Sequence, residues 1–234
     1  MSAPVVQVET RGAVALVILN RPESGNALNL QVAMDLLAAA MTCARNAAVR
    51  AVVLSGAGRH FCFGGDLRAF GARAPGGADY IRELTTYLHA AISQFVRMDS
   101  PVIAAVNGTA AGAGVGLAAM ADLALCGRSS KFNLAYTQAG LTPDAGTTFL
   151  LPRMLGLKRT MELLLLNRAL AAEEALSWGL VNEVVADEQL LARALESQMV
   201  LESETIARHA VGEEGKEGVS AFLDKRTAHF PHRD

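Results

Sequence analysis

Glycine and alanine dominate residues 107–116 of this chain, between two apolar segments. Residues 101–106, which precede them, are typical of a buried strand, and residues 117–121, which follow, are typical of a buried helix. A turn from strand to helix leaves backbone N–H groups free at the start of the helix, and the helix dipole adds positive potential there. Such a turn can bind a phosphate, or stabilise an oxyanion that develops during a reaction.

A second glycine-rich loop favours the oxyanion. The spacing of Gly112, Gly114 and Gly116 does not fit the G-x-G-x-x-G pattern of dinucleotide sites, although packing of small residues remains an alternative interpretation. The second loop, residues 60–66, follows the apolar segment 52–54. Since parallel neighbouring strands end at the same edge of a sheet, both loops can open into one crevice. Two N–H groups directed at one point there suit a thioester carbonyl that becomes an enolate or a tetrahedral anion.

The composition indicates a cytoplasmic globular protein. The chain has 234 residues, of which 51% are hydrophobic, enough for one large domain or two small ones. A net charge of −2 gives no reason to expect nucleic acid or a membrane surface as a partner. We also find no signal peptide and no apolar run near the ~18 residues of a membrane span. Three cysteines without metal-like spacing indicate a reducing compartment and no metal site.

Predicted strands alternate with predicted helices along most of the chain, which indicates an α/β domain with mainly parallel pairing. The expected strands are residues 5–8, 14–19, 51–55, 102–106, 122–126 and 181–185, of which the first two form a hairpin. The expected helices are residues 30–47, capped by residues 26–29, then 79–98, 145–154, 159–166 and 172–178. We therefore predict a core at residues 1–186 and a helical extension at residues 187–234.

Five motifs, found in the expected order, make the chain resemble the crotonase (enoyl-CoA hydratase/isomerase) superfamily. They are L-N-R-P-E-S-G-N-A-L-N at 19–29, F-C-F-G-G-D-L at 61–67, P-V-I-A-A-V-N-G at 101–108 with G-A-G at 112–114, G-L-T-P-D-A-G at 140–146, and E-G-V-S-A-F-L-D-K-R at 217–226. The resemblance implies a spiral of ββα units and an acyl-CoA substrate, with no cofactor beyond the coenzyme A of that substrate. It also implies a homotrimer or a dimer of trimers, with residues 187–234 as the trimerisation segment. Between Ser197 and Glu204 this segment is shorter than the family pattern by about 35 residues, the size of a helical hairpin.

The resemblance also assigns roles to individual residues. The backbone N–H groups of Phe63 and Ala113 are the implied oxyanion donors. Because the family usually has a small residue at position 63, the Phe63 ring either narrows the acyl pocket, presses an aromatic substrate, or turns into the core. Lys225 is implied to reach a coenzyme A phosphate from a neighbouring subunit. The full set of implied substrate contacts is Ala27, Phe61, Gly64, Gly65, Asp66, Gly112, Gly116, Tyr136 and Lys225.

The chain departs from the family at the catalytic carboxylates. Hydratases of the family use two glutamates, and the matching positions here are Gly116 and Tyr136. Asp144 is the carboxylate that remains, and its motif is similar to those of ring-epoxide isomerases of phenylacetate degradation and of chlorobenzoyl-CoA dehalogenases. An aspartate before a helix is otherwise most often a cap. We predict an acyl-CoA isomerase, acting on an enoyl double bond or a ring epoxide, with Asp144 as the acid and base.

Other functions remain open at this point. The alternatives are a hydratase-like lyase, a hydrolase or dehalogenase with Asp144 as nucleophile, and a non-catalytic acyl-CoA-binding protein. His89 falls near the water-activating histidine of the dehalogenases, although a lone histidine on a helix is more often structural or solvated. We interpret Cys62 as a small buried residue rather than a thiolate nucleophile, and Asp66 as the cap of the helix that follows the 60–66 loop.

Overall fold

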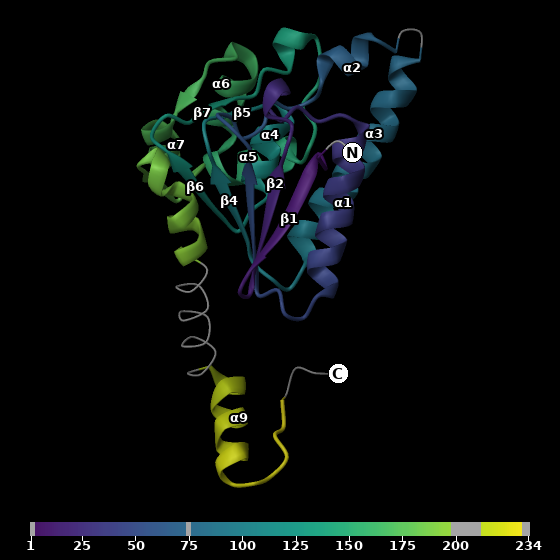
Figure 1. Cartoon of the computed structure of the whole chain (residues 1–234). Coiled ribbons are helices and arrows are strands. Elements are labelled where there is room, and N and C mark those ends of the chain that lie inside the picture. The colour runs from purple at the N-terminus through teal and green to yellow at the C-terminus, as the bar shows by residue number, and fades with distance from the viewer. Residues whose placement is uncertain (1–2, 74–75, 198–211, 231–234) are drawn as a thin grey trace. The chain divides into compact units, whose positions relative to one another are not determined.

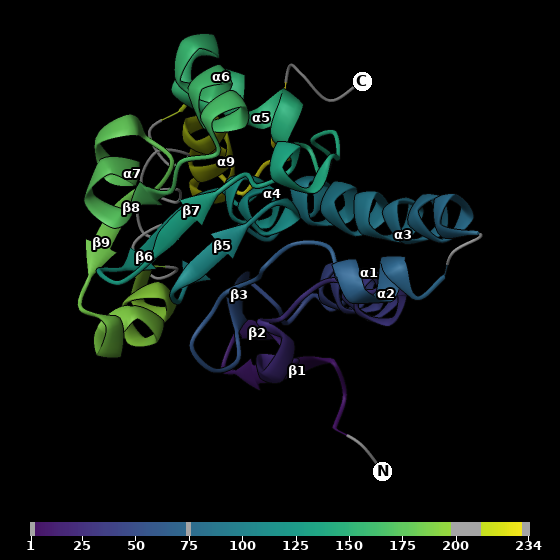
Figure 2. The ribbon, with the colours of Figure 1, turned by 90° about the horizontal axis from the view of Figure 1, so that it is seen from above.

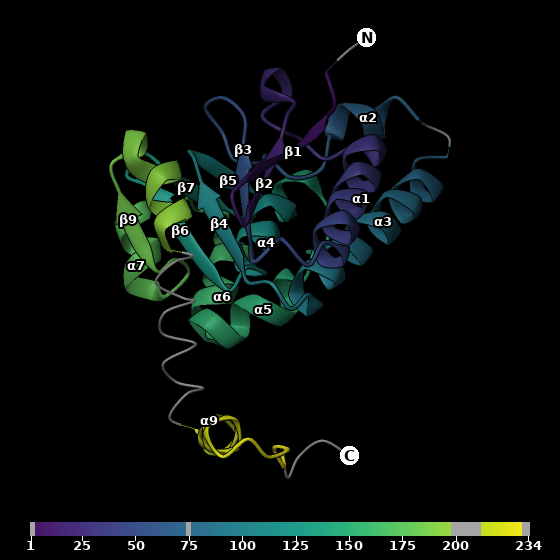
Figure 3. The ribbon, with the colours of Figure 1, turned by 60° about the horizontal axis from the view of Figure 1, so that its bottom comes forward.

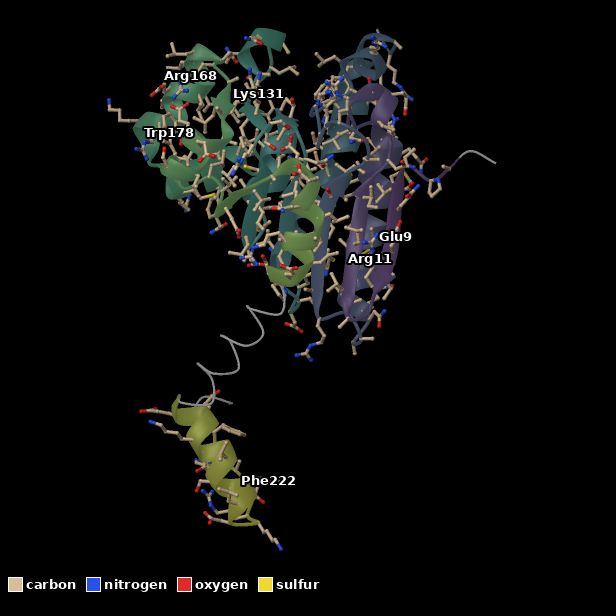
Figure 4. The ribbon with its side chains drawn as sticks, turned by 60° about the vertical axis from the view of Figure 1, so that its left-hand side comes forward. Glu9, Arg11, Lys131, Arg168, Trp178 and Phe222 are labelled. Atoms are coloured by element: carbon tan, nitrogen blue, oxygen red, sulfur yellow. The ribbon has the colours of Figure 1, made fainter. Side chains whose placement is uncertain are left out.

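A computed structural model describes residues 3–73, 76–197 and 212–230 of the chain. They fall into two compact units, Met1–Ala194 and Leu195–Asp234. The first unit contains two β-sheets and the helices that pack on them (Figure 1). The second contains α9 (Glu213–Leu223), on which Phe222 is exposed (Figure 4). The expected shortening after Ser197 lies outside the described residues, and the boundary at residue 186 stays a prediction.

The main sheet confirms the expected α/β pattern. It has six strands in the order β1-β2-β3-β4-β6-β9, and all neighbours are parallel except the β1–β2 hairpin. β3 and β4 are buried on both faces, which explains their continuous apolar sequences. The strand bounds are Val6–Arg11 for β1, Val14–Leu19 for β2, Ala51–Gly56 for β3, Val102–Val106 for β4, Leu123–Gly127 for β6 and Glu183–Val185 for β9.

The outer edge of this sheet is formed by β1, which is exposed along much of its length. Glu9 and Arg11 project from it (Figure 4), and their side chains form an ion pair of 3.1 Å. Both side chains are nearly half exposed, so the pair adds little to stability. Charged side chains on an edge strand instead discourage pairing with a strand of another chain.

Two long helices cover the β1–β2 side of the sheet. α1 (Leu30–Arg45) lies against β1 and β2, and α3 (Gly77–Arg97) packs against α1 and the short α2 (Leu67–Gly71) (Figure 2). α1 begins where the Asn29 side chain accepts the N–H of Val32 at 2.9 Å. α3 buries Leu84, Leu88 and other apolar residues at helical spacing, each worth ~1.5–3 kcal/mol. The helices predicted at residues 30–47 and 79–98 are thus confirmed.

A second, three-stranded sheet was not predicted. It consists of β5 (Thr109–Ala111), β7 (Lys131–Asn133) and β8 (Leu170–Ala171) in the order β5-β7-β8. Strands of two or three residues are too short to show an alternating pattern in the sequence. α4 (Ala113–Ala119) follows β5 directly, so this helix begins and ends earlier than the segment 117–121 that we predicted.

Three further helices lie C-terminal to the 107–116 loop. They are α5 (Thr147–Leu155), α6 (Leu157–Leu166) and α7 (Ala172–Trp178), with 3-10 turns η1 (Pro22–Ser24), η2 (Thr137–Ala139) and η3 (Asp187–Gln189). α5 packs on α4 and α6 (Figure 3). The capping role considered for Asp144 is wrong, because the N-cap of α5 is Gly146 with φ +77°. The Asp144 side chain is therefore available to other partners.

Candidate active site

The two glycine-rich loops meet, as the sequence predicted. The backbone N–H groups of Phe61 and Cys62 both donate to the carbonyl of Thr109 at 3.1 Å, and the N–H of Ala111 donates to the carbonyl of Cys62 at 2.8 Å. Gly64 lies at this junction, with φ +80°. A Cβ there would lie 2.7 Å from the Ala111 carbonyl oxygen, so only glycine fits this junction.

A pocket of about 360 Å³ opens beside this junction. Its lining is largely apolar, and no lysine or arginine is among the described residues that form it. The only titratable side chains among them are His89, Tyr136 and Asp144. The lining residues are Leu28, Phe63, Gly65, Leu67, Phe70, Ile81, Leu84, Thr85, Leu88, His89, Gly112, Ala113, Leu134, Ala135, Tyr136, Ala139, Leu141, Thr142 and Asp144.

Phe63 lines the pocket, but it is not the oxyanion donor that we predicted. Its backbone N–H donates to the carbonyl of Gly25 at 2.9 Å, so it is already paired. Phe63 is 43% exposed, and its ring packs at a tilt against His60 with 4.5 Å between ring centroids, which excludes the interpretation that it turns into the core. The ring also fills the space beside Gly25, where a Cβ would lie 2.3 Å from it.

Gly65 has the free N–H group that Phe63 lacks. The N–H of Leu28 donates to the carbonyl of Gly64 at 2.7 Å, and the N–H of Asp66 donates to the carbonyl of Leu28 at 2.9 Å. Because backbone groups alternate sides along an extended segment, this pairing directs the N–H of Gly65 away from Leu28. Among the described residues it has no hydrogen-bond partner. Sequence reasoning named Gly65 only as a substrate contact, since the alternation depends on the bridge to Leu28.

Ala113 supplies a second free N–H group. It is the first residue of α4, and the first N–H groups of a helix have no partner within the helix. Gly112, before it, donates its own N–H to the carbonyl of Asn133 at 2.8 Å, which fixes the turn. A Cβ on Gly64 would lie 3.1 Å from the Ala113 nitrogen, so the two loops are in contact here. Gly65 and Ala113 therefore present unpaired N–H groups along one pocket wall.

Asp144 lies at the pocket with two side chains beside it. The hydroxyl of Tyr136 donates to Oδ1 of Asp144 at 2.8 Å. Nε2 of His89 lies 4.0 Å from Oδ2 and accepts the backbone N–H of Ala145 at 3.3 Å. Burial, and then the charge of Asp144, raise the pKa of Tyr136 well above its ordinary value. Tyr136 is therefore a neutral hydrogen-bond donor that holds one carboxylate oxygen.

Gly116 is not a substrate contact, because the loop after Asp144 covers it. All of α4 is buried, and Gly116 is not part of the pocket lining. A Cβ on Gly116 would lie 2.4 Å from the carbonyl oxygen of Ala145. The position that holds a glutamate in family hydratases is therefore occupied by backbone here. Tyr136, at the second glutamate position, does line the pocket.

Four other predicted contacts do not line the pocket but support its walls. Phe61 is fully buried, and Gly64 is the spacer at the loop junction. Ala27 and Asp66 are linked by Arg21, which donates to the Ala27 carbonyl at 2.6 Å and to Oδ2 of Asp66 at 3.0 Å. The other oxygen of Asp66 accepts the N–H of Ala69 at 3.1 Å, which confirms its capping role at α2.

Two further side chains complete the comparison with the sequence. Cys62 is fully buried, and burial raises the pKa of its thiol to about 12, so it is a structural residue as predicted. Lys225 lies in the second compact unit, and its role stays a prediction.

Within the described part of the chain, no group of His, Cys, Asp and Glu side chains could hold a metal ion. No helix there is long and apolar enough to cross a membrane.

Comparison with known proteins agrees with this geometry. The enoyl-CoA hydratase/isomerase family model matches residues 9–211. A probable enoyl-CoA hydratase of Rhodobacter capsulatus is 41% identical over 165 residues, which cover 70% of this chain and 62% of the relative. The 1,2-epoxyphenylacetyl-CoA isomerase of Escherichia coli is 40% identical over 149 residues, which cover 63% of this chain and 57% of the relative.

Solved structures show the same fold over nearly the whole chain. An enoyl-CoA hydratase from Bacillus anthracis superposes with a TM-score of 0.81 at 27% identity, covering 98% of this chain and 100% of that structure. The chain belongs to the enoyl-CoA hydratase/isomerase family, and the predicted crotonase fold is confirmed. Its alignments span 62% and 57% of the lengths of the two curated relatives above.

Proposed function

We propose that the protein is an acyl-CoA isomerase that moves a double bond, or assists opening of a ring epoxide, through a thioester enolate. The observation that carries this proposal is the composition of the pocket. The pocket contains a single carboxylate, Asp144, and the unpaired N–H groups of Gly65 and Ala113, and the rest of its lining is largely apolar. Membership of the enoyl-CoA hydratase/isomerase family supports an acyl-CoA as the substrate.

Gly65 and Ala113 are the proposed oxyanion donors. Their N–H groups stabilise the negative charge that develops on the thioester oxygen as a proton leaves the neighbouring carbon. Fixed donors in a site shielded from water act strongly, and loss of one such donor typically raises the barrier by ~3 kcal/mol. This proposal replaces Phe63 with Gly65, because the Phe63 N–H is already bonded to Gly25.

Asp144 is the proposed acid and base. Tyr136 holds Oδ1, which leaves Oδ2 to remove a proton from one carbon of the acyl group and return it to another. A proton shuttle of this kind needs one carboxylate and no water. Hydration by the two-glutamate route needs a second carboxylate, and the described residues of the pocket include none. The geometry therefore favours isomerisation over hydration.

The substitution Asp144→Asn tests this proposal. We expect isomerisation of a 3-enoyl-CoA to slow by ~100-fold or more, the loss typical of a general base. Calorimetric binding of the acyl-CoA should remain nearly unchanged, because the amide keeps the shape of the side chain. Turnover above about a tenth of the wild-type rate would exclude Asp144 as the base. Efficient hydration of crotonyl-CoA by the wild-type protein would contradict the preference for isomerisation.

A second candidate function is that of an acyl-CoA hydrolase or dehalogenase, in which Asp144 acts as a nucleophile. The observation that favours it is that Asp144 is 29% exposed at the pocket, where one oxygen is free to attack. Mass spectrometry after incubation with 4-chlorobenzoyl-CoA distinguishes the two functions, since an acid and base leaves no covalent adduct on Asp144. Binding of acyl-CoA without turnover of any of these thioesters would instead identify a non-catalytic binding protein.

A further inference from the structure

His89 reaches from α3 to the loop that carries Asp144. Its Nε2 accepts the backbone N–H of Ala145 at 3.3 Å, and the same atom lies 4.0 Å from Oδ2 of Asp144. The imidazole is about half exposed and lines the pocket. His89 therefore contacts the proposed base and also the backbone of the residue that follows it.

The backbone after Asp144 needs such a contact. Ala145 has φ +51°, a left-handed conformation that is unfavourable for a residue other than glycine, and Gly146 follows with φ +77°. Ala145 is fully buried, with its carbonyl against Gly116. The turn is thus held from two sides, by the absence of a side chain at Gly116 and by the acceptor nitrogen of His89.

We infer that His89 is a positioning residue that keeps Asp144 in place only while its Nε2 carries no proton. An acceptor nitrogen is unprotonated, so the neutral imidazole has its hydrogen on Nδ1. In this form His89 fixes the turn at Ala145 and leaves Oδ2 of Asp144 free. The inference rests on the proposed role of Asp144 for its effect on turnover, but the tautomer of His89 does not depend on that role.

Protonation of His89 reverses both effects. A protonated Nε2 is a donor and cannot accept the Ala145 N–H, and Asp144 is the only carboxylate within 4.0 Å of it among the described residues. Tyr136 already holds the other oxygen of Asp144. α1 and α2 pack against α3, yet neither contributes a charged side chain to the pocket lining. The imidazolium would therefore pair with Oδ2, and both oxygens of the base would be occupied.

Two matched substitutions test this role in turnover. In His89→Gln the amide oxygen can replace Nε2 as an acceptor, whereas in His89→Asn the shorter side chain reaches only the position of Nδ1. We expect His89→Asn to lower kcat about tenfold or more with little change in KM, and His89→Gln to recover most of that loss. Equal rates for the two variants would overturn the inference.

A measurement without substrate separates this inference from the proposed function. Nitrogen-15 NMR of the wild-type protein at pH 8 reports which ring nitrogen of His89 is protonated, with His89→Gln used to assign the signal. We expect the hydrogen on Nδ1, and faster amide hydrogen exchange at Ala145 in His89→Asn than in His89→Gln. A hydrogen on Nε2 would overturn the inference. The expected tautomer in a protein that isomerises no 3-enoyl-CoA would support the contact and reject the proposed function.

Discussion

At the scale of single residues, the proposed chemistry depends on the partner that Tyr136 gives to Asp144. The phenol donates to Oδ1 at 2.8 Å, and its raised pKa keeps it protonated. Because deprotonation would place a second negative charge beside Asp144, burial and that charge both favour the neutral phenol. Ionisation of Tyr136 should therefore cause no loss of turnover below about pH 10, the ordinary tyrosine value.

Tyr136→Phe should lower kcat of the isomerisation by about 10- to 100-fold. A hydrogen bond to a charged group contributes ~1.5–3 kcal/mol, and each 1.4 kcal/mol is about a tenfold change in rate. KM should change little, because the ring remains in the lining. The control is Tyr87→Phe, which removes a hydroxyl from α3 outside the pocket. A Tyr136→Phe enzyme with wild-type kcat would show that the phenol does not act on Asp144.

Gly116→Glu should destabilise the protein without producing a hydratase. The first atom of any side chain at this position meets the Ala145 carbonyl at 2.4 Å, and overpacking of this kind costs ~1–3 kcal/mol. Thermal unfolding and crotonyl-CoA hydration are the two measurements. Gly116→Ala is the matched variant, since it adds only the Cβ and should already lower Tm. Hydration by a stable Gly116→Glu protein would show that the loop at Asp144 moves aside.

Some site residues followed from the sequence and others did not, for physical reasons. Ala113 and Asp144 were named from the family motifs that contain them, and both line the pocket. Phe63 was named in place of Gly65 because the direction of each N–H depends on distant partners, Gly25 and Leu28, that motif spacing does not contain. The contact between His89 and Ala145 was hidden for the same reason.

At the scale of elements, the pocket depends on how closely the 60–66 loop approaches β5 and α4. Gly64→Ala should lower both Tm and kcat. The residue has φ +80°, and its Cβ would lie 2.7 Å from the Ala111 carbonyl oxygen, so the loop must move and carry the Gly65 N–H with it. We expect a loss of ~1–3 kcal/mol in unfolding free energy.

The control for this substitution is Gly71→Ala in α2. A Cβ on Gly71 meets nothing within 4 Å, so neither Tm nor turnover should fall. Unfolding can be followed by circular dichroism and turnover by the isomerase assay. Equal behaviour of the Gly64→Ala and Gly71→Ala proteins would mean that the junction of the loops tolerates a side chain, and that Gly65 is not held by it.

Element length decided what the sequence could predict at this scale. The six strands of the main sheet and the long helices α1 and α3 were predicted. All of them except β9 have five or more residues, which is long enough for a pattern of apolar residues to show in the sequence. β5, β7 and β8 have only two or three residues each and gain their structure from pairing with one another. The start of α4 was missed because its glycines suggested a loop, although the buried helix tolerates them.

At the scale of the whole molecule, Lys225 in the second unit remains the proposed contact for a coenzyme A phosphate. Lys225→Ala should raise KM for the acyl-CoA with little change in kcat, because a remote phosphate contact binds ground and transition states alike. The effect should shrink as salt is raised, since salt screens exposed charges. Lys216→Ala, on α9, is the control for a general loss of charge. An unchanged KM at low salt would make Lys225 an ordinary surface lysine.

The fold of the whole chain was more predictable than its activity. Family motifs are spread over residues 19–226, so the fold follows from them and agrees with solved structures. The proposed activity depends on a few side chains such as Asp144 and Tyr136, whose partners are set by the three-dimensional packing.

The contact between Gly116 and the Ala145 carbonyl also limits how this protein could have diverged from its relatives. A glutamate cannot enter at position 116 while the turn after Asp144 stays in place, and that turn cannot settle where it does while any side chain stands at position 116. Each change alone brings a side-chain atom and the Ala145 carbonyl too close together, so a switch between the two arrangements requires paired changes or a backbone that moves. Variants that combine a new residue at position 116 with a remodelled 144–146 loop would trace that route in the laboratory.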